Sequence, residues 1–140
     1  MSQVNLIAVV AAGGNIGPEN GPLAFLDPEE AQDWSEWFLE VTEGGIVVVG
    51  TNTLHMMSRQ GWWGPQKGTL YTCWSRSLKV TPEQFIDKLK EECRPIFIAG
   101  GRKTYELFMP FVDMMFIKRT QAASHRHHKM PDLFGPTTLH

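Results

Sequence analysis

The stretch Pro95-Ile96-Phe97-Ile98-Ala99-Gly100-Gly101-Arg102-Lys103-Thr104-Tyr105-Glu106-Leu107-Phe108-Met109-Pro110 decides the fold. Its first apolar run predicts a buried strand over residues 96–98, which the two glycines end. A helix is predicted over residues 102–109, because the apolar residues that follow the glycines recur on one helical face and a proline then ends the pattern.

The glycine pair between this strand and this helix is a candidate anion site. The first N–H groups of a helix lack partners within it, and the helix dipole adds partial positive charge. Arg102 and Lys103 add full charges, and glycine lets a phosphate approach the main chain. The alternative is a turn that only starts a helix, since the pattern is neither the dinucleotide fingerprint nor the P-loop.

The same arrangement occurs earlier in the chain. A buried strand is predicted over residues 46–49, followed by Gly50 and then Thr51, Asn52 and Thr53, which start a short helix to about residue 58. In open α/β sheets, ligands bind at the carboxyl ends of the strands. Two such strand ends in one sheet therefore predict two anion-binding positions.

The remaining pattern predicts strands that alternate with helices, and hence an α/β fold with a mostly parallel sheet in a single domain of residues 1–140. The other predicted strands cover residues 6–12, 69–74 and 112–117, and the other predicted helices cover residues 28–41 and 82–93. A turn-rich loop over residues 13–22 follows the first strand. The helix over 82–93 starts with a capping box at Thr81 and is expected to turn Cys93 toward the core.

The helix over residues 28–41 carries an aromatic face that includes Trp34, Trp37 and Phe38. Asp33 lies four residues before Trp37 and is expected to border this face. A carboxylate next to two indoles is a candidate functional acid, with Glu30 one turn earlier as the second choice. The alternative is that these acids form the solvated flank of an amphipathic helix.

Composition excludes several classes of protein. The net charge of −2 argues against nucleic-acid binding. The chain has no apolar run of about 18 residues, so no membrane span is expected, and no basic leader precedes an apolar stretch, so a cytoplasmic location is expected. Cys73 and Cys93 are expected to be reduced, buried thiols. The cluster of His125, His127 and His128 lacks the spacing of a metal site, so no metal is expected.

With these residues in place, the chain resembles the dihydrofolate reductase family over roughly residues 4–134. The resemblance is strongest over residues 98–101, 105–110 and 113–117, and it continues over residues 6–9 with 15–21, and over residues 47–53. The order and spacing of these motifs agree with the family. The resemblance implies a dihydrofolate-reductase-like fold and hydride transfer from NADPH to 7,8-dihydrofolate.

The resemblance also implies roles for particular residues. It implies that Gly100 and Gly101 are joined by a cis peptide bond that lies against the cofactor pyrophosphate. The other implied cofactor residues are Val9, Ile16, Gly50, Thr51, Asn52, Thr53, Ser75, Arg76, Arg102, Lys103, Thr104 and Tyr105. The implied substrate residues are Ile7, Trp37, Phe38, Lys67 and Ala99, with Asp33 as the catalytic acid.

The chain departs from the family pattern at several of these positions. The resemblance implies an acid four residues before an aromatic residue of the helix. Four residues before Phe38 stands Trp34, which is not an acid, whereas four residues before Trp37 stands Asp33, which is therefore chosen. Lys118 replaces a threonine that contacts the acid, and it is expected to pair with whichever acid is present. The C-terminal hairpin of the family is expected to be absent. These departures leave two alternatives: a reductase of another pteridine or a flavin precursor, and a nucleotide-binding pseudoenzyme.

Overall fold

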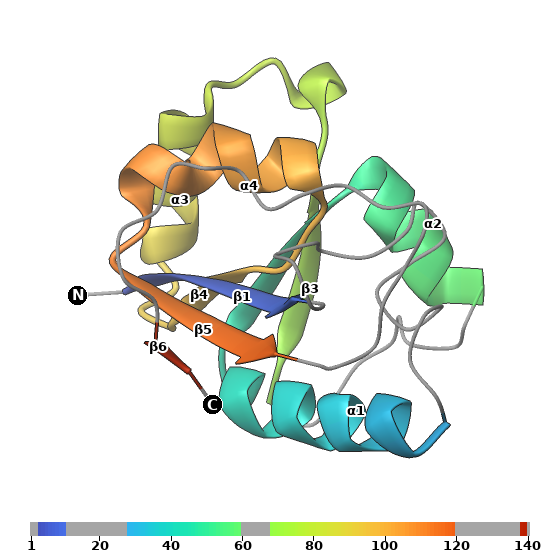
Figure 1. Cartoon of the computed structure of the whole chain (residues 1–140). Helices are drawn as coiled ribbons and strands as arrows, with labels where there is room; N and C mark the ends of the chain where they lie inside the picture. The colour runs from blue at the N-terminus through green and yellow to red at the C-terminus, as the bar shows by residue number, and fades with distance from the viewer. Residues whose placement is uncertain (1–2, 11–27, 60–67, 120–137, 140) are drawn as a thin grey trace.

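The computed structural model describes residues 3–10, 28–59, 68–119 and 138–139 (Figure 1). It contains a six-stranded sheet in the order β3-β2-β4-β1-β5-β6, in which every pairing of neighbours is parallel. The strands are β1 (Val4–Val10), β2 (Ile46–Gly50), β3 (Leu70–Trp74), β4 (Ile96–Ile98), β5 (Met114–Arg119) and β6 (Thr138–Leu139). The predicted α/β class with a mostly parallel sheet is confirmed.

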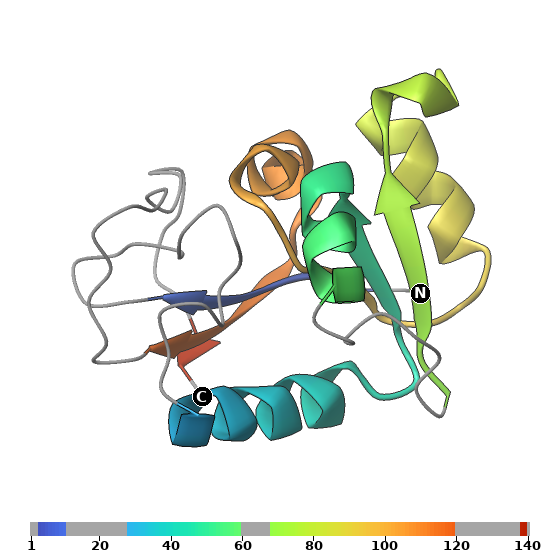
Figure 2. The ribbon, with the colours of Figure 1, turned by 90° about the vertical axis from the view of Figure 1, so that its right-hand side faces the viewer.

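Helices cover both faces of this sheet. Figures 1 and 2 show α1 (Pro28–Thr42) beneath the sheet, and α3 (Pro82–Lys90) and α4 (Arg102–Phe108) on the opposite side. Helix α2 (Thr51–Arg59) follows β2 directly. The Thr81 capping box predicted for α3 is present, with Gln84 N donating to Thr81 Oγ1 at 3.1 Å and Thr81 N donating to Gln84 Oε1 at 2.9 Å.

The core consists of two layers because neighbouring residues of each strand point to opposite faces of the sheet. In β2, Ile46 and Val48 pack on the α3 and α4 side, whereas Val47 and Val49 pack on the α1 side. All four are buried, which explains why the central strand reads as a continuous apolar run.

Strand β1 begins two residues earlier than predicted. Val4 N donates to the Asp113 carboxylate at 2.9 Å, and Asp113 N donates to Val4 O at 2.7 Å. Asn5 is buried, and its side-chain amide donates to Ile96 O at 3.2 Å. Asn5 interrupts the apolar run in the sequence, and the carbonyl of Ile96 that helps to satisfy its buried amide is distant in sequence.

Several expectations about element ends and thiols are wrong. Helix α3 ends at Lys90 rather than at residue 93, since the amides of residues 91–93 donate to carbonyls three residues back. This tightened turn leaves Cys93 exposed at φ +56°, away from the core, and Cys73 is only half-buried. Strand β5 starts at Met114 instead of residue 112, because Val112 closes the short 3₁₀ turn Met109–Phe111.

The end of the chain adds a strand that the sequence analysis does not predict. Thr138 and Leu139 pair with Phe116 and Ile117 of β5, in parallel. Within the described parts of the chain, no hairpin follows β5. The loop over residues 13–22 and the histidines at 125–128 lie outside the described residues, as do Ile16 and Lys67. None of the described helices is long and apolar enough to cross a membrane.

Candidate functional site

The sheet reverses its winding between β4 and β1. These two strands are neighbours, yet the helix that follows β1 lies on one face and the helix that follows β4 lies on the other (Figure 1). Such a switch point opens a crevice at the carboxyl ends of the strands. The Gly100–Gly101 pair stands at the carboxyl end of β4, at this point.

Backbone hydrogen bonds hold the glycine pair against β2. Ala99 N donates to Val48 O at 2.8 Å, and Gly50 N donates to Gly100 O at 2.9 Å. The Gly100–Gly101 peptide bond is cis, as the resemblance implies. Tyr105 N donates to Gly101 O at 2.9 Å, which starts α4. The two strand ends predicted to bind anions are therefore brought together.

Close neighbours or an unusual backbone angle favour glycine at these positions. A Cβ atom at Gly50 would lie 2.5 Å from Thr104 Oγ1, and Thr104 is buried. A Cβ atom at Gly101 would lie 3.3 Å from Thr53 Oγ1, and Gly100 has φ +133°. The result is a bare backbone surface next to the Thr53 hydroxyl, the kind of surface that a phosphate can approach.

Tyr105 connects α4 to the centre of the sheet. Its hydroxyl donates to Ile7 O at 2.9 Å, and this contact is buried. Burial raises the pKa of the Tyr105 hydroxyl above its usual value, so the group stays protonated and keeps donating. The structure thus places the predicted cofactor residue Tyr105 beside the predicted substrate residue Ile7.

The other predicted cofactor residues are at the ends of β2, β3 and β4. Thr51 and Asn52 are exposed at the start of α2, and Lys103 is exposed on α4. Arg102 is paired with Glu106 at 3.1 Å. Ser75 accepts from Ser77 N at 3.2 Å and thereby starts the 3₁₀ turn Arg76–Leu78.

The backbone of Val9 also lies at the carboxyl end of its strand, paired with Lys118 of β5. Arg76 follows β3 and is exposed. Since Gly50 pairs with Trp74, the residues after β2 and β3 lie at the same edge of the sheet. The backbone positions implied for the cofactor therefore share this edge.

The predicted substrate residues gather on the α1 side of the sheet. Ile7 and Phe38 belong to one buried cluster, and Trp37 and Ala99 pack against it. Phe38 is only 2% exposed and stacks on Trp34, with 5.1 Å between ring centroids. Phe38 is therefore part of the core in this structure, and it leaves almost no surface for the substrate contact that the resemblance implies. Trp37 is half-buried, and its ring nitrogen is buried.

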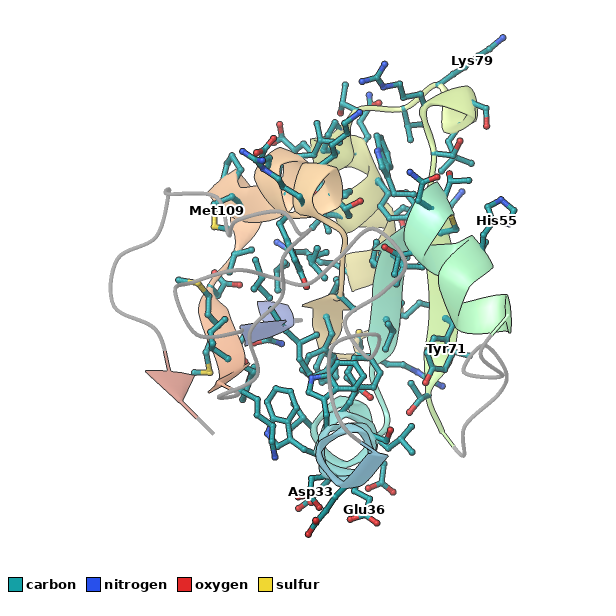
Figure 3. All side chains as sticks on the ribbon, turned by 45° about the vertical axis from the view of Figure 1, so that its right-hand side comes forward. Asp33, Glu36, His55, Tyr71, Lys79 and Met109 are labelled. Atoms are coloured by element: carbon teal, nitrogen blue, oxygen red, sulfur yellow. The ribbon has the colours of Figure 1, made fainter. Side chains whose placement is uncertain are left out.

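Asp33 does not border this cluster. Its side chain is exposed, and Figure 3 shows it pointing away from the sheet on the outer side of α1, close to Glu36. Trp34 takes the inward position and is buried. The inward-facing side chain one turn before Phe38 is therefore the indole of Trp34, not a carboxylate. The expected placement of Asp33 beside the aromatic face is therefore wrong. The side chain of Glu30 lies outside the described residues.

Lys118 has a different partner from the one expected. Its Nζ lies 5.8 Å from the ring centroid of Trp37, within the range of a cation–π interaction. Phe116, two residues earlier in β5, packs on the same α1-side cluster. Residues two apart in a strand point to the same face of the sheet, so the spacing of Phe116 and Lys118 indicates that this ammonium lies on the α1 side.

Comparison with known proteins gives a distant relationship. No protein-family model matches the chain. Over 139 aligned residues the chain is 25% identical to dihydrofolate reductase type 9 from Escherichia coli, with 86% of this chain and 72% of that protein covered. This similarity suggests a relationship to dihydrofolate reductases.

Proposed function

We propose that this chain is an NADPH-dependent reductase that converts 7,8-dihydrofolate to tetrahydrofolate. The single observation that carries the proposal is the bare backbone of Gly100 and Gly101, which has the Thr53 hydroxyl beside it and is held next to Gly50 by a backbone hydrogen bond. A Cβ atom at Gly101 would lie 3.3 Å from Thr53 Oγ1 and would narrow this surface, so the glycines present fit a pyrophosphate. The distant similarity to a dihydrofolate reductase supports the same reading.

In this proposal the two halves of the site meet at Ile7 and Tyr105. When bound, NADPH supplies the hydride. Tyr105 holds the Ile7 carbonyl through a hydrogen bond of 2.9 Å, and that carbonyl keeps a second lone pair. The carbonyls of Ile7 and Ala99 then accept N–H groups of the pterin, while the backbones of Val9 and Ile16 orient the nicotinamide amide. Lys67 is proposed to contact the glutamate tail of the substrate.

A second candidate function is reduction of another pteridine or a flavin precursor. The specific observation in its favour is the inward placement of Trp34, where an acid would be expected, together with Lys118 over Trp37. A third reading, a nucleotide-binding protein without catalysis, predicts cofactor binding with no turnover.

Consumption of NADPH in the presence of 7,8-dihydrofolate separates these three functions. Turnover that requires both compounds supports the first. Turnover with an oxidised or dihydro form of another pteridine or a flavin precursor, and none with dihydrofolate, supports the second. Saturable NADPH binding without oxidation of the cofactor by any of these substrates leaves the third.

Arg76 is expected to select NADPH over NADH. Arg102 is already paired with Glu106, whereas Arg76 is exposed and has no carboxylate partner among the described residues. A hydrogen bond to a charged group contributes about 1.5–3 kcal/mol, so Arg76→Ala should weaken NADPH binding about tenfold or more. NADH binding should hardly change in the same calorimetric titration.

Arg94→Ala is the matched control for this experiment. The Arg94 guanidinium donates to Gly68 O at 3.0 Å, near the amino ends of the strands and away from the site. It should alter neither affinity. Equal losses for NADPH and NADH in Arg76→Ala would contradict the proposed role of Arg76.

Asp33→Asn is expected to leave turnover almost unchanged. The carboxylate is exposed on the outer side of α1, and exposed substitutions usually change free energies by no more than about 0.5 kcal/mol, or roughly twofold. Glu40→Gln, on the same helix and also exposed, is the control. A loss of about 100-fold or more in Asp33→Asn alone, the size of a general-acid contribution, would make Asp33 the acid after all.

A further inference from the structure

Lys118 places a positive charge on the side of the sheet where the sequence predicts a carboxylate beside the substrate. Its ammonium lies over Trp37, and Trp37 packs against the cluster that contains Ile7 and Phe38. Among the described residues, the carboxylates of α1 on the same side of the sheet are exposed, namely Glu29, Asp33, Glu36 and Glu40. Among the described residues Lys118 forms no ion pair, so none of them occupies the three donors of its ammonium.

We infer that Lys118 is a specificity-determining residue that selects a flat heterocycle carrying carbonyl or anionic oxygens. This inference rests on the proposed function and names the substrate class of that site. A lysine ammonium only donates hydrogen bonds, so it binds ring oxygens. It repels a protonated ring or a cluster of amino groups, which a carboxylate at the same place would attract.

The position of Lys118 in the fold supports this role. It pairs with Val9 near the carboxyl ends of β1 and β5, the edge of the sheet at which the glycine pair lies. It is half-buried, so its hydrogen bonds to a ligand are less weakened by water than those of an exposed lysine. The face of Trp37 restrains the ammonium, which reduces the entropy lost when a ligand binds.

Two pteridines of the same size test the inference. 2,4-Dioxopteridine presents two carbonyl oxygens, whereas 2,4-diaminopteridine presents two amino groups and is readily protonated. We expect the wild-type chain to bind the dioxo ring about tenfold or more tightly than the diamino ring, since a hydrogen bond to a charged group is strong. Calorimetry with each pteridine alone, and again with NADPH present, measures this ratio.

Variants at two lysines complete the test. Lys118→Met should lower the affinity for the dioxo ring about tenfold, whereas Lys118→Arg should retain the preference because the cation remains. Lys88→Met, on the opposite side of the sheet in α3 and exposed, should change neither affinity. Circular dichroism checks that each variant is folded, and the wild-type ratio decides the question if Lys118→Met does not fold.

A preference of the wild-type chain for the diamino ring would overturn the inference. So would an unchanged ratio in folded Lys118→Met, or no binding of either pteridine by a chain that binds NADPH. The proposed function fails separately, in a titration with NADPH alone that shows no binding.

Discussion

Replacement of Gly101 by alanine is expected to weaken NADPH binding about 5- to 150-fold, the equivalent of the roughly 1–3 kcal/mol that an added methyl group costs in a close-packed place. The new Cβ atom would lie 3.3 Å from Thr53 Oγ1, in the space proposed for the pyrophosphate. The Gly101 backbone has φ −88°, which alanine adopts, so the variant should fold. Calorimetric titration with NADPH and a thermal unfolding curve measure the two effects.

Two further variants separate a lost ligand contact from a local clash. Gly101→Ala combined with Thr53→Ala removes the hydroxyl that the methyl group meets, and NADPH binding should stay weak. Gly50→Ala places a Cβ atom 2.5 Å from Thr104 Oγ1, so it should lower the unfolding temperature as well. Unchanged NADPH affinity in folded Gly101→Ala would show that the cofactor does not bind at this glycine.

Phe108→Ala is expected to lower the free energy of unfolding by about 3–5 kcal/mol. Phe108 is fully buried between α4 and the sheet, with its ring centroid 5.4 Å from that of Trp74 and 5.9 Å from that of Phe85. Its removal leaves a cavity at the packing that joins α3, α4 and β3. Urea unfolding followed by tryptophan fluorescence gives the change.

Leu107→Ala is the matched control for this prediction. Leu107 is the neighbouring residue of α4 and is 41% exposed, so its loss should change the free energy of unfolding by no more than about 0.5 kcal/mol. Similar changes in the two variants would mean that α4 does not pack on the sheet as described. The position of the glycine pair, which directly precedes α4, would then also be in doubt.

The strands and most of the helices follow from local patterns in the sequence. The buried runs at residues 46–49 and 96–98 are uninterrupted, and glycines mark their ends, so β2 and β4 are predicted almost to the residue. The start of β1 is missed because the polar residue Asn5 interrupts the apolar run. Its side chain donates to a carbonyl of β4, a contact that the local sequence does not show. Strand β6 has only two residues, Thr138 and Leu139, which is too short for any periodicity to be seen.

The nucleotide half of the site is easier to predict than the substrate half. The feature that matters there is the absence of a side chain at Gly50, Gly100 and Gly101, and glycines can be read directly from the sequence. The place of Asp33 depends on which face of α1 turns inward, and a window with Trp34, Trp37 and Phe38 on one side is consistent with more than one rotation of the helix. The contact of Lys118 with Trp37 joins residues from β5 and α1, which no local pattern relates.

If NADPH binds at the glycine pair, an amide chemical-shift titration of the wild-type chain with NADPH will locate it there. We expect saturable shifts at the amides of residues 50–53, 75–76 and 100–105, with the amides of residues 83–90 in α3 unaffected. No saturable shifts at about 1 mM NADPH, a concentration that would reveal even weak binding, would contradict this expectation. Saturable shifts confined to other parts of the chain would contradict it equally.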